Sequence, residues 1–199
     1  MNVASTPATK AWLTSPAKRW TQSEFHTLPE GPPYYELEEG ELIEMVRPRG
    51  RHQQIILRIG GALDDYVIRN RLGRVWPEVE VDITSTQTYV PDLSFLTNDH
   101  LDKFVDDLRI VGAPDLVVEI LSPATAARDE TKKLKTYQQA GVPWYWIINP
   151  DVLTVLEYKH TPDGYLLSQV VETGDEFAPG VFPGLIFNLA KLMDEVIGE

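Results

Sequence analysis

The stretch APDLVVEILSPATAARDETKKLKTY, from Ala113 to Tyr137, decides the fold because it joins a buried strand to a polar helix. Residues 116–121 form a nearly continuous apolar run, which is typical of a strand inside a sheet. Pro123 ends the run, and residues 125–140 have a helical composition. One carboxylate, Glu119, interrupts the strand. Because an unpaired buried charge is strongly unfavourable, we expect Glu119 to meet a partner from elsewhere in the chain.

The composition predicts one domain, from about residue 20 to residue 199, preceded by a flexible arm over residues 1–19 that shows no apolar period. The chain has no cysteine, which excludes disulfides and thiolate metal sites and fits a cytoplasmic protein. We find no apolar run long enough to cross a membrane. The net charge of −12 argues against non-specific adhesion to nucleic acid or membranes, although a local basic groove is compatible with it.

Apolar periodicity predicts the other elements, and their order predicts the fold class. A capping box at Thr21–Glu24 opens a short helix, and YELEEGELIEM over residues 35–45 predicts a β-hairpin. Further helices are expected over 52–69 and 188–197, and further strands over 75–84, 88–96, 142–148, 152–159 and 165–171. This order is typical of an α+β (mixed α/β) domain with helices on a central mixed sheet and an N-terminal hairpin.

Asp92, in the segment VPDLSF, is the best candidate partner for Glu119. If strands 89–96 and 115–121 pair in antiparallel fashion, the start of the first lies beside the end of the second. Two adjacent carboxylates repel each other, and a hard divalent cation such as Mg²⁺ or Mn²⁺ would remove that repulsion. Lys133 and Lys135 lie on the next helix, within reach of the same point, and an ammonium group there could stabilise negative charge on a phosphate. Lys133 is four residues from both Asp129 and Tyr137, on one helix face.

Each of these residues also has a plain structural interpretation. Asp92 follows a proline and could be a turn residue, and Lys133 could belong to a solvated helix surface. Between Arg47 and Arg74 there are seven arginines, which fit either an exposed helix face or a phosphate-contacting surface. On the second interpretation, the side chains that would contact nucleic acid are Arg49, Arg51, His52 and Arg58.

Long motifs in a fixed order resemble the PD-(D/E)XK nuclease superfamily and, within it, the Uma-type putative restriction endonuclease family. They are WTQSEFHTLPEGPPYYELEEGELIEM, Arg49 to Gln53, VPDLSF, APDLVVEILSPAT, RDETKKLKTYQQAGVPWYWIINP and FPGLIFNL. The superfamily motif normally places its lysine two residues after the acid, where this chain has Leu121. In the Uma-type family the lysine is displaced to the following helix.

The resemblance implies a restriction-endonuclease-like fold and a metal-dependent endonuclease that acts on nucleic acid, with DNA as the expected partner. It implies that Asp92 and Glu119 bind Mg²⁺ or Mn²⁺ and that Lys133 assists the reaction. It also implies that Glu41 is an N-terminal acid near the metal and that His52 faces the site. A homodimer is a further expectation, with strand 142–148 as one possible interface. Two alternatives stay open: a nuclease-fold binding module without catalysis, and a hydrolase of small phosphodiesters.

Overall fold

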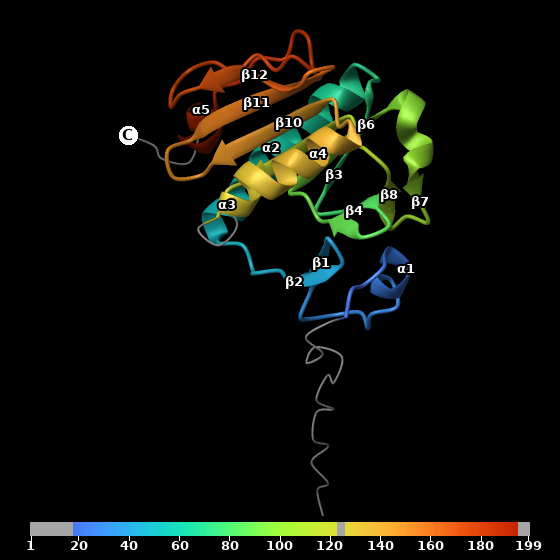
Figure 1. Ribbon diagram of the computed structural model, residues 1–199. Coiled ribbons are helices and arrows are strands. Elements are labelled where there is room, and N and C mark those ends of the chain that lie inside the picture. The colour runs from blue at the N-terminus through green and yellow to red at the C-terminus, as the bar shows by residue number, and fades with distance from the viewer. Residues whose placement is uncertain (1–17, 123–125, 195–199) are drawn as a thin grey trace, which may run out of the picture.

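Two six-stranded sheets form the framework of the protein, in a computed structural model that describes residues 18–122 and 126–194 (Figure 1). The central sheet contains, in spatial order, β12 (Gly164–Val171), β11 (Thr154–Thr161), β10 (Trp144–Asn149), β9 (Leu116–Ile120), β6 (Leu93–Thr97) and β3 (Gly73–Pro77). The hairpin sheet contains β2 (Glu41–Glu44), β1 (Tyr35–Glu38), β5 (Gln87–Tyr89), β4 (Glu80–Thr84), β8 (Arg109–Val111) and β7 (Phe104–Val105).

Both sheets are mixed, and each contains one parallel pair. Strands β9 and β10 run parallel in the central sheet, as do β4 and β8 in the hairpin sheet, whereas the other pairs are antiparallel. The predicted α+β class with a mixed central sheet is confirmed. The second sheet was not foreseen, because a hairpin in sequence does not reveal which strands it will join.

Helices cover the two faces of the central sheet (Figure 1). The long helix α2 (Gly50–Arg69) packs its apolar side against one face, in a core that includes Ile55, Ile59, Val118 and Trp146. A second helical segment crosses the opposite face. It comprises α3 (Ala126–Arg128), the π-helical turn η3 (Asp129–Lys133) and α4 (Leu134–Ala140). The shorter helices are α1 (Gln22–Phe25), the 3₁₀ helix η2 (Asn98–Lys103) and α5 (Leu189–Asp194).

Local sequence signals predict many of these boundaries correctly. The capping box joins Thr21 to Glu24 as expected, and the hairpin forms with Glu36 opposite Ile43. Asn188 caps α5, since its side-chain oxygen accepts a hydrogen bond from the Lys191 amide at 2.9 Å. The predicted arm over residues 1–19 lies almost entirely outside the described residues.

Two predicted strands are each divided between the sheets. Residues 75–84 form the end of β3 and all of β4, which are separated at Glu78, a residue with a positive φ of 46°. Residues 88–96 contribute to β5 and β6, which are separated around Pro91 because proline cannot donate a ladder hydrogen bond. Because of these breaks, the residues of one continuous apolar pattern are divided between a strand of the central sheet and a strand of the hairpin sheet.

Strand β10 is an interior strand, which corrects the suggestion that residues 142–148 form a dimer interface. It lies between β9 and β11, and the side chains of Tyr145 and Trp146 are fully buried. The aromatic run therefore serves the core, where burial of large rings contributes most to stability. Among the described residues, the structure contains no helix with the length and apolar character of a membrane span.

Candidate active site

Glu119 lies in β9 with only 4% of its surface exposed, on the sheet face covered by η3 and α4. Side chains alternate along a strand, so Glu119 shares this face with Val117 and is directed toward the helix. Its Oε1 atom accepts hydrogen bonds from Lys133 Nζ at 2.8 Å and from the Tyr137 hydroxyl at 2.9 Å. The buried carboxylate thus has the partners that its position in an apolar strand required.

Asp92 stands immediately before β6 and lies across from Glu119. Strands β6 and β9 pair in antiparallel fashion with Leu93 opposite Val118, so the next position pairs Asp92 with Glu119. The predicted pairing of these two strands is therefore confirmed. Asp92 Oδ2 accepts a hydrogen bond from the Ile120 amide at 2.6 Å, and Oδ1 lies 2.7 Å from His52 Nε2.

Lys133 reaches Glu119 from the π-helical turn, and its ammonium group is almost completely buried. Two other carboxylates lie near Nζ: Glu36 at 3.1 Å and Asp129 at 3.6 Å. The sequence prediction that Asp129, Lys133 and Tyr137 share one helix face is confirmed by these contacts. Such wide turns occur often at functional sites because they redirect side chains out of regular helical spacing.

Strand β1 supplies an acid that the sequence analysis missed. Glu36 and Glu38 point into the molecule, and both form ion pairs with Arg128. Glu38 also accepts a hydrogen bond from Lys132 at 2.8 Å. The alternation of glutamate with apolar residues in this strand resembled a solvated face, so only the docking of the hairpin against the helix reveals the role of Glu36.

Glu41 does not occupy the place that the family resemblance gave it. Its side chain is 61% exposed to solvent on the hairpin, and its Oε1 atom lies 3.1 Å from Arg19 Nη1. Among the described residues, the carboxylates within 4 Å of Lys133 Nζ are those of Glu36, Asp129 and Glu119. The acid that the N-terminal hairpin brings to this cluster is therefore Glu36.

The residues proposed to contact nucleic acid surround the first turns of α2. His52 is buried against Asp92, as the resemblance implied, whereas Arg49 is exposed at the helix N-terminus. Arg51 donates a hydrogen bond from Nε to the Pro150 carbonyl at 2.5 Å. Arg58, about two turns further along α2, is half-buried. Arg51 is thus the chain neighbour of His52, which contacts Asp92, and Arg49 precedes His52 by three residues.

Burial and charge shift the protonation equilibria within this cluster. Burial raises the pKa of Glu119 well above its usual value; Lys133 opposes this shift, and Asp129, Asp92 and Glu36 reinforce it. Burial alone would lower the pKa of Lys133, but attraction to Glu119, Glu36 and Asp129 raises it above its usual value. Lys133 therefore stays protonated, in surroundings that still carry an excess of acidic groups.

Asp92 and Glu119 are hard oxygen donors, the ligand type that Mg²⁺ and Mn²⁺ prefer. Asp92 and Glu119 offer carboxylate oxygens from adjacent strands, and the excess of acids disfavours the ionised form of Glu119. In the parts of the chain that the structure describes, no group of three or more His, Cys, Asp or Glu side chains has the arrangement of a metal cage. Mg²⁺ commonly binds through one or two carboxylates and completes its shell with water and phosphate.

The raised pKa of Glu119 predicts a pH dependence of stability in metal-free buffer. Between its unfolded value near 4.5 and its higher folded value, Glu119 binds more protons in the folded state. The free energy of unfolding should therefore fall as pH rises through this window. Glu119→Gln should remove this part of the decline, which urea unfolding with EDTA from about pH 4 to about pH 8 would measure. Parallel pH profiles for both proteins would contradict the assignment.

The mixed sheet flanked by helices has a nuclease-like class of fold, with Asp92 and Glu119 on adjacent strands and Lys133 on the following helix. A family model described as "Uma2: Putative restriction endonuclease" matches residues 22–190, so the chain belongs to the Uma2 family. A comparison with curated proteins finds no significant match. The chain is also similar to a crystal structure titled as a putative nuclease belonging to DUF820 from Anabaena variabilis ATCC 29413. That similarity has 26% identity and a TM-score of 0.72, and covers 87% of this chain and 97% of the other.

Proposed function

We propose that this protein is a metal-dependent endonuclease that hydrolyses phosphodiester bonds, with DNA as the substrate. The observation that carries the proposal is the position of Glu119, which accepts a hydrogen bond from Lys133 and lies opposite Asp92 on the adjacent strand. Membership of a family described as putative restriction endonucleases supports the reaction class and the choice of DNA. The buried, acid-rich surroundings of Glu119 support a functional role, because such groups concentrate at active sites.

In this proposal Asp92 and Glu119 hold Mg²⁺ or Mn²⁺ at the scissile phosphate. The bound cation supplies Lewis-acid stabilisation of the phosphate and favours ionisation of a water molecule. Lys133 remains charged and donates a hydrogen bond to the attacking water or to a phosphate oxygen as negative charge develops. Tyr137 and His52 orient the two carboxylates through the hydrogen bonds described above.

A binding module without catalysis is the second candidate. The net charge of −12 favours it, because many proteins that act on nucleic acid are basic and draw part of their affinity from phosphate contacts. Retention of both acids and the buried lysine favours the enzyme. Hydrolysis would distinguish the two candidates directly.

Metal removal provides the test of the proposed function. Supercoiled plasmid incubated with the protein and Mn²⁺ should be converted to nicked and linear forms, because the cation offsets charge on the phosphate. EDTA should abolish the conversion, and added Mn²⁺ should restore it, as followed by agarose electrophoresis. Intact plasmid with Mn²⁺, under conditions where the protein binds DNA, would favour the binding module. Nicking that persists in EDTA would contradict the metal-dependent mechanism.

A further inference from the structure

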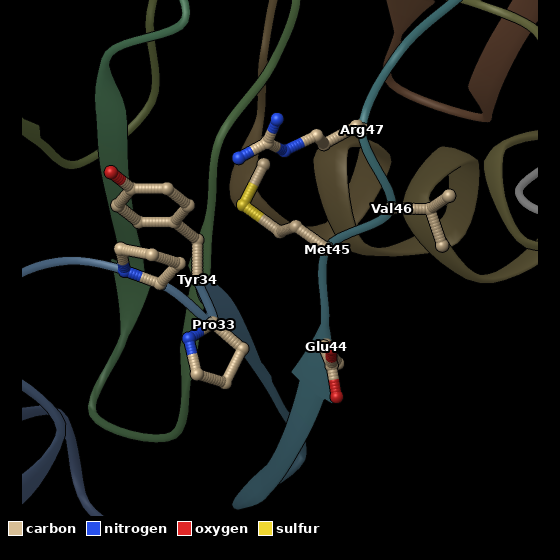
Figure 2. Close-up of a pocket in the computed structure, with 7 residues that line it drawn as sticks. Pro33, Tyr34, Glu44, Met45, Val46 and Arg47 are labelled. Carbon is tan, nitrogen blue, oxygen red and sulfur yellow. The ribbon is translucent and has the colours of Figure 1, made fainter.

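A surface pocket lies where the hairpin sheet gives way to helix α2 (Figure 2). One wall comes from Pro33 and Tyr34, just before β1, and the other from Met45 and Arg47, just after β2. Figure 2 shows the side chains of Met45 and Arg47 directed toward Tyr34 across the gap, whereas Val46 points to the other side. None of the proposed catalytic residues lines this pocket.

The walls of the pocket combine a ring, a thioether and a guanidinium group with one carboxylate, that of Glu44. The side chain of Tyr34 is 59% exposed, which is unusual for a large ring in this protein, where most are buried. The thioether of Met45 is polarisable and makes favourable contacts with π systems. Arg47 has no carboxylate within 4 Å anywhere in residues 18–122 and 126–194, so its guanidinium charge is available for an anion.

Both walls continue directly into the candidate active site. Tyr34 precedes Glu36 by two residues, and Glu36 lies 3.1 Å from Lys133 Nζ. Arg47 precedes His52 by five residues, and His52 lies 2.7 Å from Asp92. At about 3.5 Å per residue, these chain segments span at most roughly 7 Å and roughly 17 Å. The pocket therefore lies within a few nucleotides of a phosphate bound beside Lys133 at the proposed site, at about 3.4 Å per nucleotide along a strand.

We propose that this pocket receives an unpaired nucleobase of the strand being cut, stacked on Tyr34, while Arg47 contacts the adjacent phosphate. The inference rests on the proposed function, because it assumes that a nucleic-acid strand is bound at Asp92, Glu119 and Lys133 and continues from there to the pocket. A base inside a duplex has both faces covered by its neighbours, so only a single-stranded or extruded nucleotide can enter. The preferred substrate is then a nucleic acid with an unpaired segment, in DNA or in RNA.

The test measures binding of short fluorescein-labelled oligonucleotides by anisotropy, with EDTA present to prevent cleavage. Tyr34→Ala should weaken binding of single strands about tenfold, the size expected when one base loses an aromatic stacking partner. Tyr34→Phe should bind within about twofold of the wild type, since the ring is kept. Arg47→Ala should weaken binding and reduce its salt dependence, because one phosphate contact is lost.

Controls and substrate arms make the result specific to the pocket. Val46→Ala changes an exposed neighbour whose side chain points away from Tyr34, and should leave binding unchanged. Blunt duplexes of the same sequence should bind Tyr34→Ala and wild type equally, whereas parallel DNA and RNA single strands show which backbone is accepted. Equal binding of single strands by wild type and Tyr34→Ala, or an equal loss for duplexes, would overturn the inference.

The outcomes also separate this inference from the proposed function. Plasmid nicking with Mn²⁺ and an unchanged affinity of Tyr34→Ala for single strands would reject the pocket and keep the nuclease. Tyr34-dependent binding without any nicking would keep the pocket and reject the nuclease. A wild-type protein that binds no single strand would overturn the pocket, and the nicking assay would then decide the nuclease independently.

Discussion

Glu119→Gln is expected to abolish Mn²⁺ binding and to lower the rate of plasmid nicking by on the order of a thousandfold. The amide has the shape of the carboxylate and can still accept from Lys133 and Tyr137, so the fold should be retained. It cannot supply the negative charge that a hard cation requires. Isothermal titration with Mn²⁺ would measure affinity, and a nicking time course would measure rate.

Asp92→Asn should reproduce both losses, because the two carboxylates are proposed to hold one cation from adjacent strands. Its fold should also survive, although the hydrogen bond from the Ile120 amide is weakened. Glu172→Gln, on an exposed residue after β12, is the matched control and should leave both readouts unchanged. Unchanged Mn²⁺ affinity in Glu119→Gln and Asp92→Asn would reject the assignment of metal ligands.

Lys133→Met should abolish nicking and destabilise the protein by about 3–5 kcal/mol, the usual cost of removing one partner from a buried ion pair. Methionine fills a similar volume but leaves the carboxylates of Glu36, Asp129 and Glu119 without their shared cation. Urea unfolding at neutral pH would measure the change in the free energy of unfolding. Circular dichroism would confirm that the variant is folded under the conditions of the nicking assay.

A double-mutant cycle separates the charge effect from simple loss of packing. Adding Glu36→Gln to Lys133→Met should recover part of the lost stability, because the pKa of Glu36 is lowered and its ionised carboxylate is one of the charges that lose Lys133. Lys135→Met changes an exposed lysine on the same helix and should alter stability by less than about 0.5 kcal/mol. Equal stability of Lys133→Met and Lys135→Met would contradict the expected contribution of the buried ion pairs.

Local chemistry explains why the centre of the site could be predicted from sequence. Glu119 was conspicuous because a carboxylate interrupts an apolar strand, and antiparallel pairing then led to Asp92. Lys133 was chosen through the family resemblance, which implies that the lysine stands on the helix after the acid rather than two residues beyond it. The inferences about Glu119 and Asp92 need only neighbours along one strand, together with the pairing of two strands.

The rest of the site depends on tertiary packing that sequence periodicity does not encode. Glu36 alternates with apolar residues, as a solvent-facing residue would, yet the hairpin docks that face against Arg128 and Lys133. The breaks between β3 and β4 at Glu78 and between β5 and β6 at Pro91 were not predicted either. Strands of both sheets show the same apolar alternation, so the pattern does not reveal where one sheet ends and the other begins. The pocket at Tyr34 likewise requires two segments that only the folded hairpin brings together.

The widened turn over residues 129–133 makes the position of Asp129 relative to the ammonium group dependent on local chain length. Each residue of a regular helix advances the side-chain direction by about 100°. Shortening this turn by one residue would let an ordinary α-helical turn form, with the strand before it and the helix after it still anchored in their own cores. Lys133 would keep its place, because it is joined directly to the anchored helix, whereas Asp129 would rotate by about 100° relative to it. The set of acids around the ammonium group can therefore change through one residue in length, without exchange of the amino acids in the cluster.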